Sequence, residues 1–119
     1  TKAGVGAENT ALVGFSQGTM MSLYVAPRRD AAFAAVVGYS GRLLAPQLLA
    51  SQAVSKPPVM LIHGEMDDLV PFESMAEAEA GLTAAAFSVE TLACPGLGHG
   101  IDPSGLQRGG AFLKAAFAG

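Results

Sequence analysis

The chain alternates short apolar runs of strand length with longer stretches of helical spacing, and this alternation restricts its possible folds more than any other feature. Each apolar run is nearly continuous, which is typical of a strand buried on both faces. Strands and helices that alternate in this way form βαβ units, in which helices cover both faces of a mostly parallel sheet. We therefore predict an α/β fold with about four parallel strands. The predicted strands are 10–15, 34–39, 59–63 and 87–93.

The segments between and after these strands carry helix signals. Helices are predicted over 17–26, near 46–52, and from a first turn that contains Pro71 to about Leu82. The final helix has the clearest start, because Asp102 is placed to cap it and Pro103 to occupy its first turn.

Charge and composition exclude several classes of partner. The chain has seven Lys and Arg against ten Asp and Glu, with no basic run, so neither nucleic acid nor a charged lipid surface is expected as a partner. Its apolar runs are much shorter than the roughly 18 residues of a membrane span, so no span is expected. One cysteine, Cys94, and two histidines allow no internal disulfide and provide no zinc ligand set.

Residues 14–18, Gly-Phe-Ser-Gln-Gly, match the G-x-S-x-G pattern of a nucleophile elbow and lie between the first predicted strand and helix. Such an elbow needs small residues two before and two after the serine, so that neighbouring backbone can approach; Gly14 and Gly18 meet this need. Ser16 is therefore a candidate nucleophile, although serine is also an ordinary helix cap. The Gln17 amide would then face the oxyanion of a tetrahedral intermediate.

A serine nucleophile needs a base, and the base needs a carboxylate to orient it. Residues 63–71, His-Gly-Glu-Met-Asp-Asp-Leu-Val-Pro, follow the third strand, and a Gly-His-Gly sequence centred on His99 follows the fourth. These loops should meet, because the carboxyl ends of parallel strands share one edge of the sheet. We expect His99 to be the base and His63, at the end of a buried strand, to be structural. From the residues alone, either Asp67 or Asp68 could reach the imidazole.

The three motifs, taken in order, resemble the carboxylesterase/phospholipase family of α/β-hydrolases, which includes the acyl-protein thioesterases. The resemblance implies that Ser16 is the nucleophile and His99 the base. It implies that Asp67 is the acid, as the fifth residue of a His-Gly-x-x-Asp-x-x-Val-Pro segment. The implied activity is that of a serine carboxylesterase, acting through an acyl-enzyme on small to medium acyl esters, with thioesters and lysophospholipids as further candidate substrates. No metal or organic cofactor is implied.

Members of this family have a sheet of about eight strands in a chain roughly twice as long. The resemblance therefore implies that residues 1–119 are the C-terminal part of a single α/β-hydrolase domain. The earlier strands, and the early loop that donates a second oxyanion amide, would be absent from this chain. We expect the N-terminal half of the same domain as a partner, with activity only in its presence, and a cytoplasmic location. Only 14% of the residues are charged, which fits a half sheet with an apolar edge.

Several alternatives stay open at this point. Leu43 and Met66 follow strand ends and are candidates to line the substrate site, although leucine and methionine are more often core residues. The chain could instead be a non-enzymatic interaction module that pairs with a second copy along an exposed strand edge, giving a homodimer. It could also be a serine peptidase or a dienelactone hydrolase of the same fold, although the latter favours a cysteine at the elbow.

Overall fold

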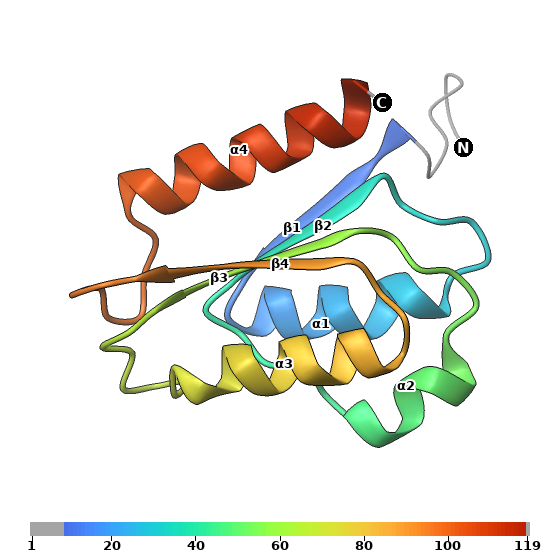
Figure 1. Cartoon of the computed structure of the whole chain (residues 1–119), viewed down its shortest axis with the longest axis horizontal. Coiled ribbons are helices and arrows are strands. Elements are labelled where there is room, and N and C mark those ends of the chain that lie inside the picture. The colour runs from blue at the N-terminus through green and yellow to red at the C-terminus, as the bar shows by residue number, and fades with distance from the viewer. Residues whose placement is uncertain (1–8, 119) are drawn as a thin grey trace.

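A computed structural model of the chain describes residues 9–118 (Figure 1). Its four strands form one parallel sheet in the order β1-β2-β3-β4, which confirms the predicted α/β class. The elements follow one another as β1 (Ala11–Phe15), α1 (Gln17–Val25), the 3₁₀ turn η3 (Ala26–Arg28), β2 (Ala35–Tyr39), α2 (Pro46–Gln52), β3 (Val59–Gly64), α3 (Glu73–Ala84), β4 (Val89–Cys94) and α4 (Pro103–Ala118).

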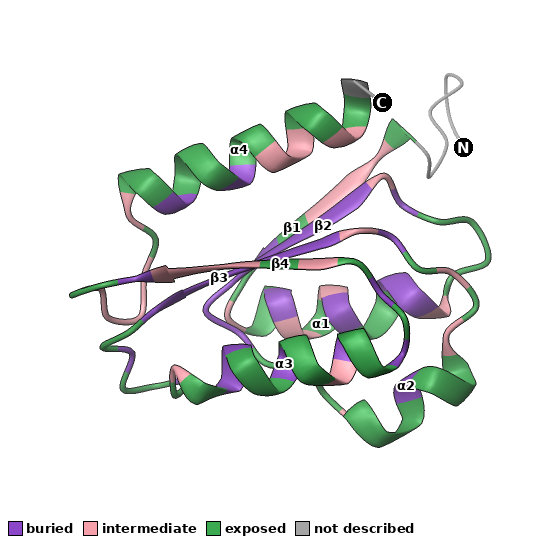
Figure 2. Cartoon of the chain, viewed as in Figure 1, coloured by how far each residue is buried: buried purple, intermediate pink, exposed green. Residues whose placement is uncertain are grey.

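The sheet separates two helical layers (Figure 1). Within residues 9–118, helices α1, α2 and α3 lie on one face and α4 lies on the other. Strands β2 and β3 are buried along their whole length, which explains their continuous apolar sequences (Figure 2). The core on the first face includes Leu23, Leu49, Val59, Leu61 and Leu82. The core under α4 includes Val37, Tyr39, Met60, Ile62 and Cys94.

Strand β1 is covered less well than its sequence predicts. Val13 and Phe15 are 56% and 40% exposed, whereas their register partners Val37 and Tyr39 on β2 are 0% and 4% exposed. Paired residues of neighbouring strands point to the same face of a sheet, so the difference comes from the covering layer. Helix α4 packs over β2, β3 and β4. The α4 side of β1 is therefore an apolar surface open to solvent within residues 9–118.

The ends of the elements follow local hydrogen bonding. As predicted, Asp102 caps α4, because its carboxylate accepts the Gly105 amide at 2.8 Å and the Ser104 hydroxyl at 2.9 Å. Helix α3 begins at Glu73, later than predicted, because Pro71 lies in the turn before the helix and its carbonyl accepts the Ser74 amide at 2.8 Å.

Helix α4 lies close against the sheet because small residues face Tyr39. The Tyr39 hydroxyl donates to the Gly105 carbonyl at 3.1 Å. A Cβ atom on Gly109 would overlap this hydroxyl, and Tyr39 is buried and cannot move aside easily. Gly110, one position later, has open space around it among the described residues.

These two neighbouring glycines should respond to alanine in opposite directions. Gly110→Ala should raise the free energy of unfolding by about 0.5–1 kcal/mol, because alanine is the better helix former. Gly109→Ala should lower it by about 1–3 kcal/mol, since overpacking against Tyr39 outweighs the helix propensity. Urea unfolding of both variants measures the difference. Equal effects of the two substitutions would show that α4 does not pack as described.

Candidate active site

Ser16 occupies a strained turn between β1 and α1. Its φ of 56° and ψ of −113° place it in a region that costs a non-glycine residue about 1–3 kcal/mol. The carbonyl of Tyr39, at the end of β2, holds the turn from below: it accepts the Ser16 amide at 2.9 Å and the Thr19 hydroxyl at 2.8 Å. This backbone conformation is that of a nucleophile elbow, in which a sharp turn from strand to helix presents the serine hydroxyl at the end of the sheet.

The two glycines that flank the serine differ in their surroundings. A Cβ atom on Gly14 would lie 2.5 Å from backbone atoms of Gly18 and Thr19, so Gly14 has no room for a side chain, as predicted. A Cβ atom on Gly18 would meet nothing within 4 Å among the described residues, so its predicted close approach is not observed. Gln17 is the first residue of α1, where backbone amides lack an acceptor within the helix and the helix dipole is positive.

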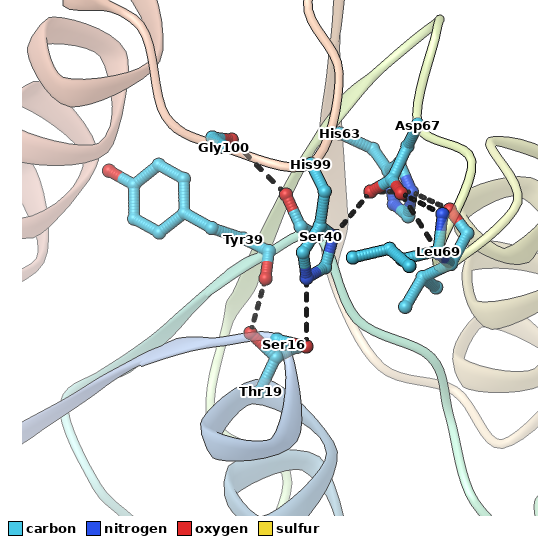
Figure 3. A network of polar contacts seen from close by, with 10 residues as sticks. Ser16, Thr19, Tyr39, Ser40, His63, Asp67, Leu69, His99 and Gly100 are labelled. Atoms are coloured by element: carbon cyan, nitrogen blue, oxygen red, sulfur yellow. Dashed lines mark hydrogen bonds and ion pairs between the residues drawn. The ribbon is translucent and has the colours of Figure 1, made fainter.

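His99 connects the serine to a carboxylate (Figure 3). Its Nε2 lies 3.1 Å from Ser16 Oγ, and its Nδ1 lies 2.8 Å from Asp67 Oδ2. An ionised carboxylate can only accept, so Nδ1 donates to Asp67 and Nε2 is left to accept the Ser16 proton. The Phe15 ring packs against the imidazole, with ring centroids 4.9 Å apart. The structure thus brings together the three predicted side chains from loops far apart in the sequence.

Asp67, and not Asp68, is the carboxylate in contact with His99. The Asp67 side chain has no exposure to solvent, while Asp68 is exposed. Burial by itself raises the pKa of Asp67, but the hydrogen bonds outweigh burial and the net pKa is lowered. Those bonds come from His99 and from the amides of Val70 and Leu69, both 2.9 Å from Oδ1. Asp67 is therefore ionised at neutral pH and held in one orientation.

Two further polar contacts support the site: one is made by Ser40, and the other by His63, which the sequence predicted to be structural. The Ser40 hydroxyl donates to the Gly100 carbonyl at 3.2 Å and so ties the loop of His99 to the end of β2. Ser40 is buried and has a φ of 53°. Like Ser16, it therefore has a positive φ and lies at the end of a strand. The second contact is made by His63, whose Nε2 donates to the Val70 carbonyl at 2.8 Å. A Ser-Gly pair after a predicted strand was the only sequence signal for Ser40.

The remaining candidates lie away from this hydrogen-bonded chain. Leu43 is buried in the core beside α3, Met66 is 67% exposed, and substrate contact by either residue stays a prediction.

Cys94 is buried, and burial together with the Asp102 carboxylate raises the pKa of its thiol. Residues 9–118 contain no cluster of three or more His, Cys, Asp or Glu side chains suited to a metal ion. No helix in the same range is both long enough and apolar enough to span a membrane.

A parallel sheet with helices on both faces, and a serine, an imidazole and a buried carboxylate at its carboxyl edge, define the α/β-hydrolase class. Within that class, the chain belongs to the phospholipase/carboxylesterase family, which matches residues 1–117.

Named relatives agree with this assignment. Acyl-protein thioesterase 1 of Gibberella zeae is 32% identical over 117 residues, which cover 94% of this chain and 50% of that protein. Esterase YpfH of Escherichia coli is 33% identical over 106 residues, covering 89% of this chain and 44% of the relative. The crystal structure of esterase PE8 superposes with a TM-score of 0.93 at 39% identity, covering 97% of this chain and 54% of that one. The chain therefore spans about half the length of the proteins that it matches.

The lowered pKa of Asp67 predicts how stability depends on pH. Its stabilising contribution is fully present above the unfolded value of 3.8 and is lost as the pH falls through the lower folded value. Asp67→Asn should therefore lower the free energy of unfolding most near neutral pH, and the difference from wild type should narrow below pH 3.8. Urea unfolding across this range measures it, with the exposed Asp68→Asn as the matched control. A constant difference at all pH values would contradict the prediction.

Proposed function

We propose that this chain carries the catalytic residues of a serine carboxylesterase that acts on small to medium acyl esters. The observation that carries the proposal is the continuous path from Ser16 Oγ through both ring nitrogens of His99 to Asp67, over 3.1 Å and 2.8 Å. The strained backbone of Ser16 supports it, because this strain is what exposes the hydroxyl. Membership of the phospholipase/carboxylesterase family gives independent support.

The geometry suggests how each group would act. Ser16 Oγ attacks the ester carbonyl carbon while its proton passes to His99 Nε2, and Asp67 stabilises the resulting imidazolium through Nδ1–H. The Gln17 amide donates to the oxyanion of the tetrahedral intermediate. That intermediate collapses to an acyl-enzyme when the leaving alcohol takes the proton from Nε2. Water gives a proton to His99 Nε2 and attacks the acyl carbon; the bond to Ser16 Oγ then breaks, the acid is released, and Oγ takes the proton back from Nε2.

The substrate class is part of the proposal. Relatives named as an esterase and as an acyl-protein thioesterase support oxygen esters first and thioesters second. Lysophospholipids are a third candidate, in line with the family's description. We also propose a cytoplasmic location, which fits a single free and buried thiol, Cys94.

Substitutions in the complete protein test the assignment of the three residues. Ser16→Ala should abolish both p-nitrophenyl ester hydrolysis and labelling by a fluorophosphonate. Asp67→Asn should lower kcat by about 10⁴-fold, because His99 would lose the tautomer that accepts the serine proton. Asp68→Asn is the matched control and should retain nearly full kcat, since its side chain is exposed.

Three results would contradict the proposal. Labelling that persists in Ser16→Ala would place the nucleophile elsewhere. Similar losses in the Asp67 and Asp68 variants would contradict the assignment of the acid. Faster cleavage of peptide amides than of esters would favour the serine peptidase.

We further propose that residues 1–119 form the C-terminal part of one hydrolase domain, which the N-terminal half completes. The exposed Val13 and Phe15 support this, since the matching positions on β2 are covered by α4. The N-terminal half would pair with β1, cover this face, and supply the second oxyanion amide.

The complete domain should be far more active than the 119-residue chain. Loss of one oxyanion donor alone typically lowers kcat by about 10²- to 10³-fold. The comparison is kcat/KM for a p-nitrophenyl ester, with intact mass and oligomeric state measured on both samples. A monomeric 119-residue chain with the activity of the complete protein would overturn the proposal. A fully active homodimer of the short chain would show instead that a second copy covers β1.

A further inference from the structure

His63 is a buried titratable side chain that the proposed mechanism does not use. It lies near the end of β3, directly before the loop that carries Asp67, and is 2% exposed. Its Nε2 lies 2.8 Å from the Val70 carbonyl oxygen. That oxygen can only accept a hydrogen bond, so Nε2 must carry a proton and act as the donor. A nitrogen committed in this way is not available as a second general base.

The bond from His63 closes the acid loop on itself (Figure 3). The carbonyl of Val70 accepts from His63, and the amide of Val70 donates to Asp67 Oδ1 at 2.9 Å. One residue therefore links the imidazole to the carboxylate. In addition, His63 Nε2 lies 3.4 Å from Asp67 Oδ2, the oxygen that also accepts from His99. The positive N–H edge of His63 thus faces the oxygen that pairs with the candidate base.

The surroundings hold His63 in this orientation. Its backbone pairs with Ala93 of β4, and its ring meets the edge of Phe72 with centroids 6.1 Å apart. The following residue, Gly64, packs so tightly that a Cβ atom there would overlap the carbonyls of Leu97 and Gly98, in the loop that carries His99. The end of β3 therefore supports the acid loop and the base loop together.

We propose that His63 is a positioning residue for the reaction, and the proposal rests on the function proposed above. As a fixed Nε2–H donor, it holds the Val70 peptide and keeps Asp67 Oδ2 directed at His99 Nδ1. Without the donor, the Val70 carbonyl would be buried and unpaired, and the acid loop would relax toward solvent to satisfy it. A displacement of about 1 Å at a catalytic group can lower a rate by about 10²-fold. Because His63 is only 2% exposed, it should not touch the substrate, and its effect should appear in kcat and not in KM.

Two substitutions in the complete protein separate hydrogen bonding from packing. His63→Gln places an amide nitrogen at nearly the reach of Nε2 and keeps a donor, so it should retain most of kcat. His63→Leu keeps a similar volume without a donor and should lower kcat by about 10- to 100-fold with KM unchanged. Ser55→Ala is the matched control: it removes a partly buried side-chain donor to the Ala26 carbonyl, 3.2 Å away next to the C-terminal end of α1, and should lower stability without changing kcat.

A second readout follows the position of Asp67 directly. The His99 Nδ1–H proton, which lies between nitrogen and carboxylate, gives a proton NMR resonance far downfield of other imidazole protons. It should persist in His63→Gln and in Ser55→Ala, and should shift upfield or vanish in His63→Leu. This measurement requires a folded protein but no enzymatic activity.

The outcomes are distinct for the two proposals. Equal kcat values in the Gln and Leu variants, whether retained or lost, would overturn the positioning role, as would an unchanged resonance in His63→Leu. If His63→Leu fails to fold, a large loss of kcat in His63→Gln still overturns it, and a retained kcat with the resonance in place supports it. A folded wild-type protein that neither hydrolyses esters nor labels at Ser16 overturns the proposed function instead.

Discussion

The carboxylate of Asp67, which is ionised and fully shielded from solvent, is the constraint on which the rest of the site depends. Burial of a charge is unfavourable unless hydrogen bonds replace the lost water. Here the amides of Leu69 and Val70 satisfy one carboxylate oxygen, and His99 satisfies the other. The lowered pKa shows that these bonds outweigh desolvation. The same bonds dictate the path of the acid loop and the direction of the imidazole, so the stability of the carboxylate and the aim of the base toward Ser16 have one physical origin.

Two of the four non-glycine residues with positive φ among residues 9–118 lie at the same edge of the sheet. Ser16 and Ser40 both have positive φ, each at the carboxyl end of a strand, and such residues cost about 1–3 kcal/mol each. Hydrogen bonds that are net favourable by about 0.5–1.5 kcal/mol each offset this strain. For Ser16 the acceptor is the Tyr39 carbonyl, which also holds Thr19, and for Ser40 the side chain itself donates to Gly100. Hydrogen bonds at the end of the buried strand β2 therefore stabilise the two backbone conformations that place the candidate nucleophile and the base loop.

Much of this arrangement could be predicted from the sequence, and the failures have physical reasons. Continuous apolar runs predicted β2 and β3 correctly, because burial on both faces leaves a direct mark on composition. The same pattern predicts that β1 is buried on both faces, which residues 9–118 alone do not provide, since an apolar run does not show which segment covers it. Asp67 and Asp68 were indistinguishable without the family resemblance, because adjacent loop residues differ only in direction. His63 was predicted to be structural, but its hydrogen-bond acceptor could not be predicted, because that acceptor is the backbone carbonyl of Val70 and carbonyl orientation leaves no trace in residue identity.

The uncovered face of β1 links the completeness of the fold to the chemistry of the site. Phe15 is 40% exposed on this face, and its ring is also the one that packs against His99. Any segment that covered Val13 and Phe15 would therefore remove water from one side of the imidazole. Electrostatic attraction between an imidazolium and Asp67 strengthens as the local dielectric constant falls, while the loss of water around the imidazolium opposes it, so the close contact of 2.8 Å between Nδ1 and Asp67 becomes decisive. Covering β1 would thus do more than bury apolar surface: it would make the charge on His99 in the proposed ester hydrolysis depend on Asp67 rather than on water.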